Sequence, residues 1–235
     1  MKAPIILAID TSDLATAKEW VKATNESVSV YKLGLEFFLN FGADGVRTIK
    51  EESGSDIFLD LKLHDIPHTV AGAARSIADL SPKFLTIHAS GGEAMIKAAV
   101  EPVPQIDITA VTILTSLSED DLFKVGFANN ALESAVALAK LAVDSGAKAI
   151  VCSPLEVAAI RKTVGPKPSL ITPGVRPIAD VGKDDQNRTM TPAAAISAGA
   201  SYVVIGRPIT SEWEKGAGAM KEKAAMIAAE LLAVN

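Results

Sequence analysis

Short β-branched apolar runs alternate with amphipathic, Ala-rich stretches along the whole chain, and this alternation restricts the possible fold more than any other feature. The apolar runs have the length and composition of buried strands and cover residues 5–10, 28–34, 57–63, 84–89, 108–114, 149–153, 169–174 and 202–207. Stretches with helical periodicity lie between or after them, among them 14–24, 70–80, 93–100, 131–146, 155–164, 192–200 and 219–234. This succession, without a Ser/Gly/Pro-rich linker, predicts an α/β protein with a single (β/α)8 TIM barrel domain over residues 1–235. A doubly wound sheet is the second choice.

Composition and charge exclude several classes of partner. The 235 residues are 49% hydrophobic and 22% charged, which is ordinary for a folded globular enzyme. A net charge of −5 and the lack of a long Lys/Arg run argue against binding to nucleic acid or to an anionic membrane. The apolar run before Asp10 is no convincing signal peptide, and no stretch reaches the roughly 20 apolar residues of a membrane span. We expect a cytoplasmic protein whose single cysteine, Cys152, packs as a small buried hydrophobe.

The strand at 57–63 carries charges where a buried strand should carry none. Within "IFLDLKLHDIPHTV", strand alternation puts Asp60 and Lys62 on the face opposite Leu59, and Asp65 follows shortly after. Burying an unpaired charge costs on the order of several kcal/mol, so such a row needs internal compensation or a chemical purpose. Lys32, from the preceding strand, supplies a further positive charge. Two interpretations stay open, a structural ion-pair network and an acid–base device.

Polar residues also follow the other strands at their C-terminal ends, where barrel enzymes keep their active sites. They include Asp10, Lys32, His88, Thr115 and Ser116. The segments "TPGVRP" and "VVIGRPIT" leave the last two strands at the usual phosphate site of this fold. Their candidate anion ligands, together with one residue of the neighbouring loop, are Arg176, Gln186, Gly206 and Arg207. These positions predict a phosphorylated small-molecule substrate.

A metal site is an alternative interpretation, because His64, His68 and His88 all lie at or just beyond strand ends. Lys32 and Lys62 would crowd a cation at the same mouth, and no spacing here matches a metal-ligand signature. We therefore expect no metal.

The motifs together resemble those of the orotidine 5′-monophosphate (OMP) decarboxylase family, in that family's order. The similar segments are "LAIDTSD", "YKLG", "FLDLKLHDIPHTV", "TILTS", "TPGVRP", "DDQNRTMTP" and "VVIGRPIT", which span nearly the whole chain. The resemblance implies decarboxylation of OMP to UMP in pyrimidine biosynthesis, without metal or organic cofactor. It also implies a homodimer.

The resemblance assigns a role to each matching position. Lys62 would be the proton donor and Lys32 would pair with Asp60, whereas Asp65 and Thr69 would reach into the active site of the partner subunit. The implied substrate-binding residues are Asp10 and Lys32 for the ribose, Thr115 and Ser116 for the pyrimidine, and Arg176, Gln186, Gly206 and Arg207 for the phosphate.

Two rival functions remain. A Mg²⁺-dependent sugar-phosphate decarboxylase or synthase of the same suprafamily would share the barrel, the phosphate site and the D-x-K-x-x-D pattern. A noncatalytic phosphometabolite-binding protein is disfavoured, because a binding module has little need for a proton-donating lysine between two carboxylates.

Overall fold

Eight parallel strands close into a barrel in the computed structural model, which describes residues 2–176 and 190–234. The strands follow one another in chain order around the barrel, and β8 pairs with β1 to close it. They are β1 (Ala3–Ala8), β2 (Val28–Gly34), β3 (Asp56–Leu63), β4 (Phe84–His88), β5 (Asp107–Val111), β6 (Ala149–Val151), β7 (Ser169–Thr172) and β8 (Tyr202–Ile205). The predicted TIM barrel is confirmed.

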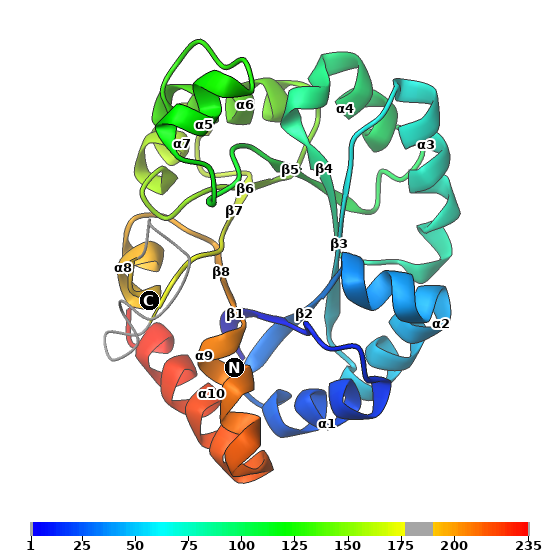
Figure 1. Ribbon diagram of the computed structural model, residues 1–235, viewed down its shortest axis with the longest axis vertical. Coiled ribbons are helices and arrows are strands. Elements are labelled where there is room, and N and C mark those ends of the chain that lie inside the picture. The colour runs from blue at the N-terminus through cyan, green and yellow to red at the C-terminus, as the bar shows by residue number, and fades with distance from the viewer. Residues whose placement is uncertain (1, 177–189, 235) are drawn as a thin grey trace.

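Helices form a ring outside the strands, as the view along the barrel shows (Figure 1). They are α1 (Leu14–Thr24), α2 (Leu35–Ser53), α3 (Pro67–Ser76), α4 (Gly92–Val100), α5 (Glu119–Lys124), α6 (Ala131–Asp144), α7 (Val157–Val164), α8 (Pro192–Ser197), α9 (Arg207–Thr210) and α10 (Ala217–Leu232). Local sequence sets several of their starts. Asp13 caps α1 by accepting from the amides of Ala15 and Thr16, and Pro67 opens α3 at a position where no amide donor is needed. None of the helices among the described residues is long and apolar enough to cross a membrane.

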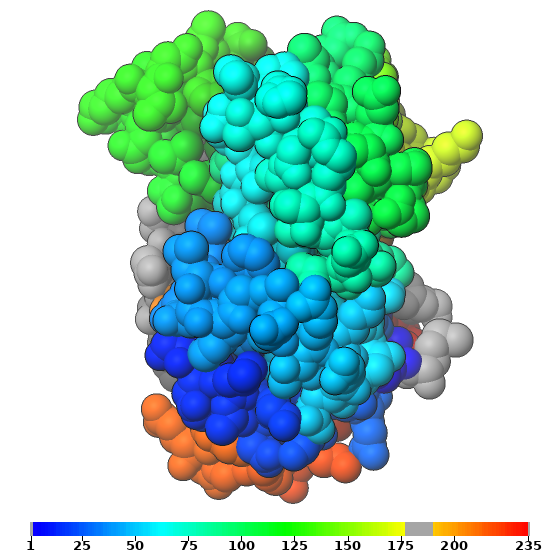
Figure 2. Space-filling model, turned by 90° about the vertical axis from the view of Figure 1, so that its right-hand side faces the viewer, coloured from blue at the N-terminus to red at the C-terminus, as the bar shows by residue number. Residues whose placement is uncertain are grey.

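Some predicted boundaries differ from the structure. The run at 108–114 leaves the sheet at Val111, although Thr112 and Ile113 remain buried. The run at 202–207 ends at Ile205, and α9 begins at Arg207. In the first run side chains stay buried beyond the strand end, and in the second the chain turns into α9, so apolar character overstates strand length in both. Helix α5 lies in the connection between β5 and α6, and Figure 2 shows this green segment projecting from the body.

Two apolar clusters hold the barrel. The larger one packs strands against helices, and the smaller one fills the interior with Ile6, Val30, Phe58, Phe84, Ala149 and Ile171. Edge-to-face aromatic contacts join Phe84 to Phe58 at 5.6 Å and to Tyr202 at 5.7 Å between ring centroids. Phe84 and Tyr202 are the first residues of β4 and β8, so aromatic rings fill the N-terminal end of the barrel. The C-terminal end is left for polar side chains.

Candidate active site

A cavity of about 200 Å³ opens at the C-terminal mouth of the barrel. Predicted site residues provide its polar lining, namely Lys32, Asp60, Lys62 and Thr115. The rest of its wall is apolar and consists of Phe58, Val111, Val151, Pro173 and Val204. This apolar wall was not predictable from the sequence, because valines in buried strands have no local feature that separates a cavity wall from an ordinary core.

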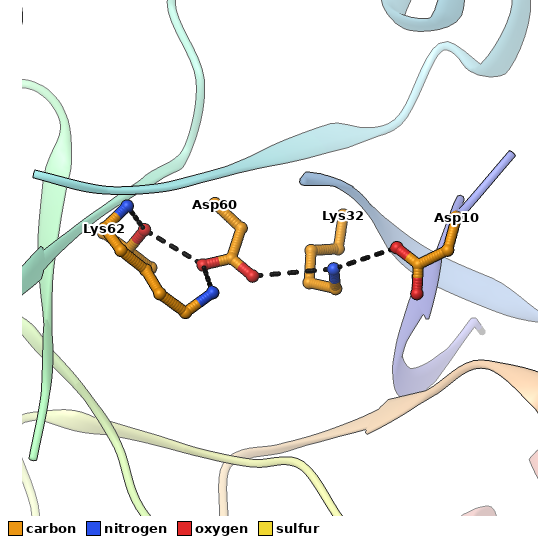
Figure 3. A network of polar contacts seen from close by, with 5 residues as sticks. Asp10, Lys32, Asp60 and Lys62 are labelled. Atoms are coloured by element: carbon orange, nitrogen blue, oxygen red, sulfur yellow. Dashed lines mark hydrogen bonds and ion pairs between the residues drawn. The ribbon is translucent and has the colours of Figure 1, made fainter. Parts of the chain in front are cut away.

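A row of alternating charges runs along one side of the mouth (Figure 3). Lys32 Nζ lies 3.3 Å from Asp10 Oδ1 and 3.5 Å from Asp60 Oδ2. Lys62 Nζ donates to the other oxygen of the same carboxylate, Asp60 Oδ1, at 2.8 Å. Each oxygen of Asp60 therefore meets one ammonium group, so these three charges compensate one another.

Asp60 is buried and remains an anion. Burial alone would raise the pKa of its carboxyl group, but Lys32, Lys62 and a hydrogen bond from Thr86 outweigh burial and hold that pKa below its usual range. The enclosed site thus keeps a fixed negative charge between two lysines at neutral pH.

The backbone at Lys62 departs from regular strand geometry. Its φ is 49°, a left-handed conformation that side chains other than glycine adopt rarely. The β3–β4 pairing is interrupted here, since Leu59 is opposite Leu85 and Leu63 is opposite Ile87. Three residues of β3 therefore face one residue of β4, which is a bulge. Such conformations cost on the order of 1–3 kcal/mol and cluster at functional sites.

Asp65 and Thr69 lie outside the cavity. Both are exposed, and the Asp65 carboxylate accepts from the amide of Ile66 at 2.6 Å. Asp65 lines a separate, open groove with His64, Pro67 and neighbouring residues. Within one chain, the structure does not bring either residue to the charged row.

Three of the four predicted phosphate residues lie near the ends of β7 and β8. Gly206 precedes α9, and Arg207 is exposed in the first turn of that helix. Arg176 is buried, and its Nη1 donates to the carbonyl of Val175 at 3.0 Å. Gln186 lies outside the described residues, and Ser116 is exposed beside Thr115. Their roles stay predictions.

The histidines form no metal centre in residues 2–176 and 190–234. His64 and His88 face each other with ring centroids 5.4 Å apart, and burial, His64 and Lys62 together lower the pKa of His88. No group of three or more His, Cys, Asp or Glu side chains comes together there to hold an ion.

Cys152 is fully buried, as expected for a packing residue. Burial, followed by the charge of Glu156, raises the pKa of its thiol to about 12. A thiol with so high a pKa is a poor nucleophile at neutral pH.

Comparison with known proteins agrees with these observations. The model of the orotidine 5′-phosphate decarboxylase / HUMPS family matches residues 3–221. The chain belongs to this family. The predicted family, and the enzyme class that it implies, are confirmed, whereas the roles of individual residues are not tested by these matches.

Individual family members are similar over nearly the full chain. An orotidine 5′-phosphate decarboxylase of Thermobifida fusca is 52% identical over 231 residues, covering 98% of this chain and 97% of that protein. One from Frankia casuarinae is 44% identical, covering 97% of this chain and 89% of the relative. The crystal structure of the Lactobacillus acidophilus orotidine 5′-phosphate decarboxylase has a TM-score of 0.83 at 33% identity, covering 98% and 99% of the two chains.

Proposed function

We propose that this family member converts OMP to UMP and CO2 in pyrimidine biosynthesis, without a metal or organic cofactor, and that Lys62 is the proton donor. The observation that carries the proposal is the Lys32–Asp60–Lys62 row, which borders a partly apolar cavity at the C-terminal mouth. This is the end of the barrel where enzymes of this fold keep their active sites.

The proposed reaction places negative charge where Lys62 can stabilise it. The bond between C6 and the carboxylate breaks, its electron pair stays on C6, and CO2 leaves. No neighbouring carbonyl can take up this charge as an ordinary enolate, so fixed electrostatics must stabilise the carbanion. The Lys62 ammonium then donates a proton from Nζ to C6, and the amine regains a proton from solvent.

Asp60 has two effects in this proposal. Its carboxylate accepts from Lys62 Nζ and so orients the proton donor. Its negative charge also disfavours a substrate carboxylate in the same cavity, and that repulsion ends when neutral CO2 forms. Lys32 keeps Asp60 ionised from the other side, and we assign ribose binding to Asp10 and Lys32.

The apolar wall supports the same direction of reaction. Val111, Val151 and Phe58 line the cavity that also contains the charged groups. An apolar surface accommodates neutral CO2 better than a carboxylate, because desolvating a charge is costly. Thr115, which lines the cavity, and Ser116 are the proposed ligands of the pyrimidine ring.

Binding energy from the phosphate would orient the reacting ring from a distance. We assign phosphate binding to Gly206 and Arg207, with Arg176 and Gln186. Arg207 supports this assignment because it is exposed at the β8 exit, where a guanidinium can pair with a phosphate through two hydrogen bonds.

We further propose a homodimer in which Asp65 and Thr69 complete the partner's active site. Both are exposed beside the mouth rather than in their own cavity. Large apolar side chains are exposed near the starts of α2 and α3: Leu35 at 49%, Leu39 at 81% and Ile66 at 66%. A contiguous exposed apolar patch rimmed by polar residues marks a site of protein–protein contact.

CO2 release from OMP in the presence of EDTA tests the activity. We expect turnover that the chelator does not change. Loss of turnover with EDTA, restored by Mg²⁺, would favour the metal-dependent alternative. Binding of a UMP analogue without any turnover would instead favour a noncatalytic binding protein.

A further inference from the structure

Thr86 connects the two residues on which the proposed chemistry depends. It is the one residue of β4 opposite the three-residue bulge of β3, and its side chain is fully buried. Its hydroxyl accepts a hydrogen bond from the backbone amide of Lys62 at 2.8 Å. The same hydroxyl donates to Asp60 Oδ1 at 3.0 Å.

The direction of these two bonds follows from the chemistry of the groups. An ionised carboxylate can only accept, so the hydroxyl proton of Thr86 points to Asp60. A lone pair of the same oxygen is then left for the amide of Lys62, which can only donate. One hydroxyl therefore fixes both the carboxylate and the strained backbone that bears the proton-donating side chain.

Lys62 Nζ meets the same oxygen, Asp60 Oδ1, that receives the Thr86 hydroxyl. The three groups form a closed loop, from the Lys62 amide through Thr86 and Asp60 back to the Lys62 amine. Opening the loop would release Lys62 from its left-handed φ of 49° and let the amine move. Misplacement of a reacting group by about 1 Å can reduce the rate roughly 100-fold.

We propose that Thr86 is a positioning residue, whose hydroxyl holds Asp60 and Lys62 in the geometry that protonation at C6 requires. This inference rests on the proposed decarboxylation. Thr86 itself contacts the two site residues and is assigned no contact with the substrate.

Thr86→Val tests the proposal, because valine keeps the shape, the β-branch and the burial of threonine but has no hydroxyl. Thr109→Val is the matched control. Thr109 is the register partner of Thr86 on β5, is equally buried, and donates its hydroxyl to the carbonyl of Asp107 in its own strand.

We expect kcat for OMP to fall about 10- to 100-fold in Thr86→Val, with the dissociation constant of UMP within about twofold of wild type. Thr109→Val should keep kcat within about twofold of wild type, even where its midpoint of thermal unfolding changes. A Thr86→Val kcat equal to that of Thr109→Val, or a loss confined to KM and UMP affinity, would overturn the positioning role.

A second pair of variants tests the same role of the hydroxyl if Thr86→Val does not fold. Thr86→Ser and Thr86→Ala both remove the methyl group and differ in the hydroxyl. Serine should restore kcat to within about threefold of wild type, while alanine should show the full loss. Equal kcat values in these two variants would refute the inference. If wild-type protein releases no CO2 from OMP, the proposed function fails and this inference fails with it, whereas the outcomes above leave that function intact.

Discussion

Lysine–aspartate pairs occur at both ends of the barrel, but among the described residues only the Lys32–Asp60 pair, at the C-terminal mouth, has both side chains enclosed. The side chains of Lys32 and Asp60 are 14% and 11% exposed at that mouth. At the opposite end, Lys83 pairs with Asp56 at 2.9 Å, and their side chains are 34% and 52% exposed. Residue type therefore does not separate the two pairs. Enclosure does.

The two ends also differ in what surrounds the charges. Lys83 lies 5.6 Å from the ring centroid of Phe84, over the aromatic cluster that fills the N-terminal end. At the mouth, a bulge, a left-handed lysine and a cavity replace that packing. An exposed pair contributes little to stability, whereas enclosed charges beside strained backbone need a functional explanation.

The largest difference between the ends should appear in catalysis. Lys62→Ala should reduce turnover of OMP by more than about 1,000-fold, because it removes both the proton donor and the positive charge near C6. Lys83→Ala, the control at the other end, should leave kcat unchanged. Steady-state assays with UMP binding as a check on folding would measure both. Near-normal turnover in Lys62→Ala would exclude the proposed mechanism.

The second prediction concerns whether the residues of one active site come from one chain or from two. Lys62→Ala and Asp65→Ala should each be inactive alone. In a mixed dimer one site would carry both lesions and the other neither, so about a quarter of all sites should be native after random exchange of equal amounts. Unfolding the two variants together, refolding them and assaying OMP turnover measures the recovery.

As a control, Lys62→Ala is mixed with Asp60→Ala instead of Asp65→Ala. Asp60 and Lys62 line the cavity of the same chain. That mixture should stay inactive, because both lesions affect the site of their own chain. Activity of the first mixture that remains at the level of its separate parents, despite confirmed subunit exchange, would show that Asp65 acts within its own chain.

The fold and the charged residues of the mouth could be predicted from the sequence, but the features that distinguish the mouth from the other end could not. Strand–helix alternation predicted the barrel, and strand alternation placed Asp60 and Lys62 on one face. The bulge was not predictable, because it arises from pairing with β4, more than 20 residues away in the chain. Thr86 was missed for the same reason, since a threonine in "FLTIHA" looks like an ordinary strand residue. Val111 and Val151 gave no signal because cavity walls and cores use the same residue types.

The third prediction concerns binding at the rim of the mouth. Arg207→Ala should raise KM for OMP about 10- to 100-fold, because a charge-assisted hydrogen bond contributes about 1.5–3 kcal/mol. Lys148→Ala removes the same charge at the opposite end, where Lys148 Nζ lies 3.6 Å from Asp107, and should leave KM unchanged. Similar KM values in the two variants would mean that the phosphate lies elsewhere.

The smallest expected effect is on stability, and its pH dependence separates the two ends most directly. The pKa of Asp60 is lowered from 3.8 in the folded protein, so its ionised form is stabilised there. Above the unfolded pKa this contribution is fully present. As the pH falls, the unfolded chain takes up the proton first, and the contribution is lost by the time the folded carboxyl is protonated.

Asp60→Asn should therefore lower the free energy of unfolding by about 1–3 kcal/mol at pH 7, because Lys32 and Lys62 lose their shared anion. The gap to wild type should shrink as the pH falls below about 4. Asp56→Asn, at the exposed end, should cost less than about 1 kcal/mol at pH 7. Urea unfolding of the three proteins between pH 7 and pH 3 measures these differences. If the difference in free energy of unfolding between wild type and Asp60→Asn does not change with pH, the enclosed carboxylate stabilises the fold through shape and hydrogen bonding alone. Its charge would then serve catalysis without adding to stability.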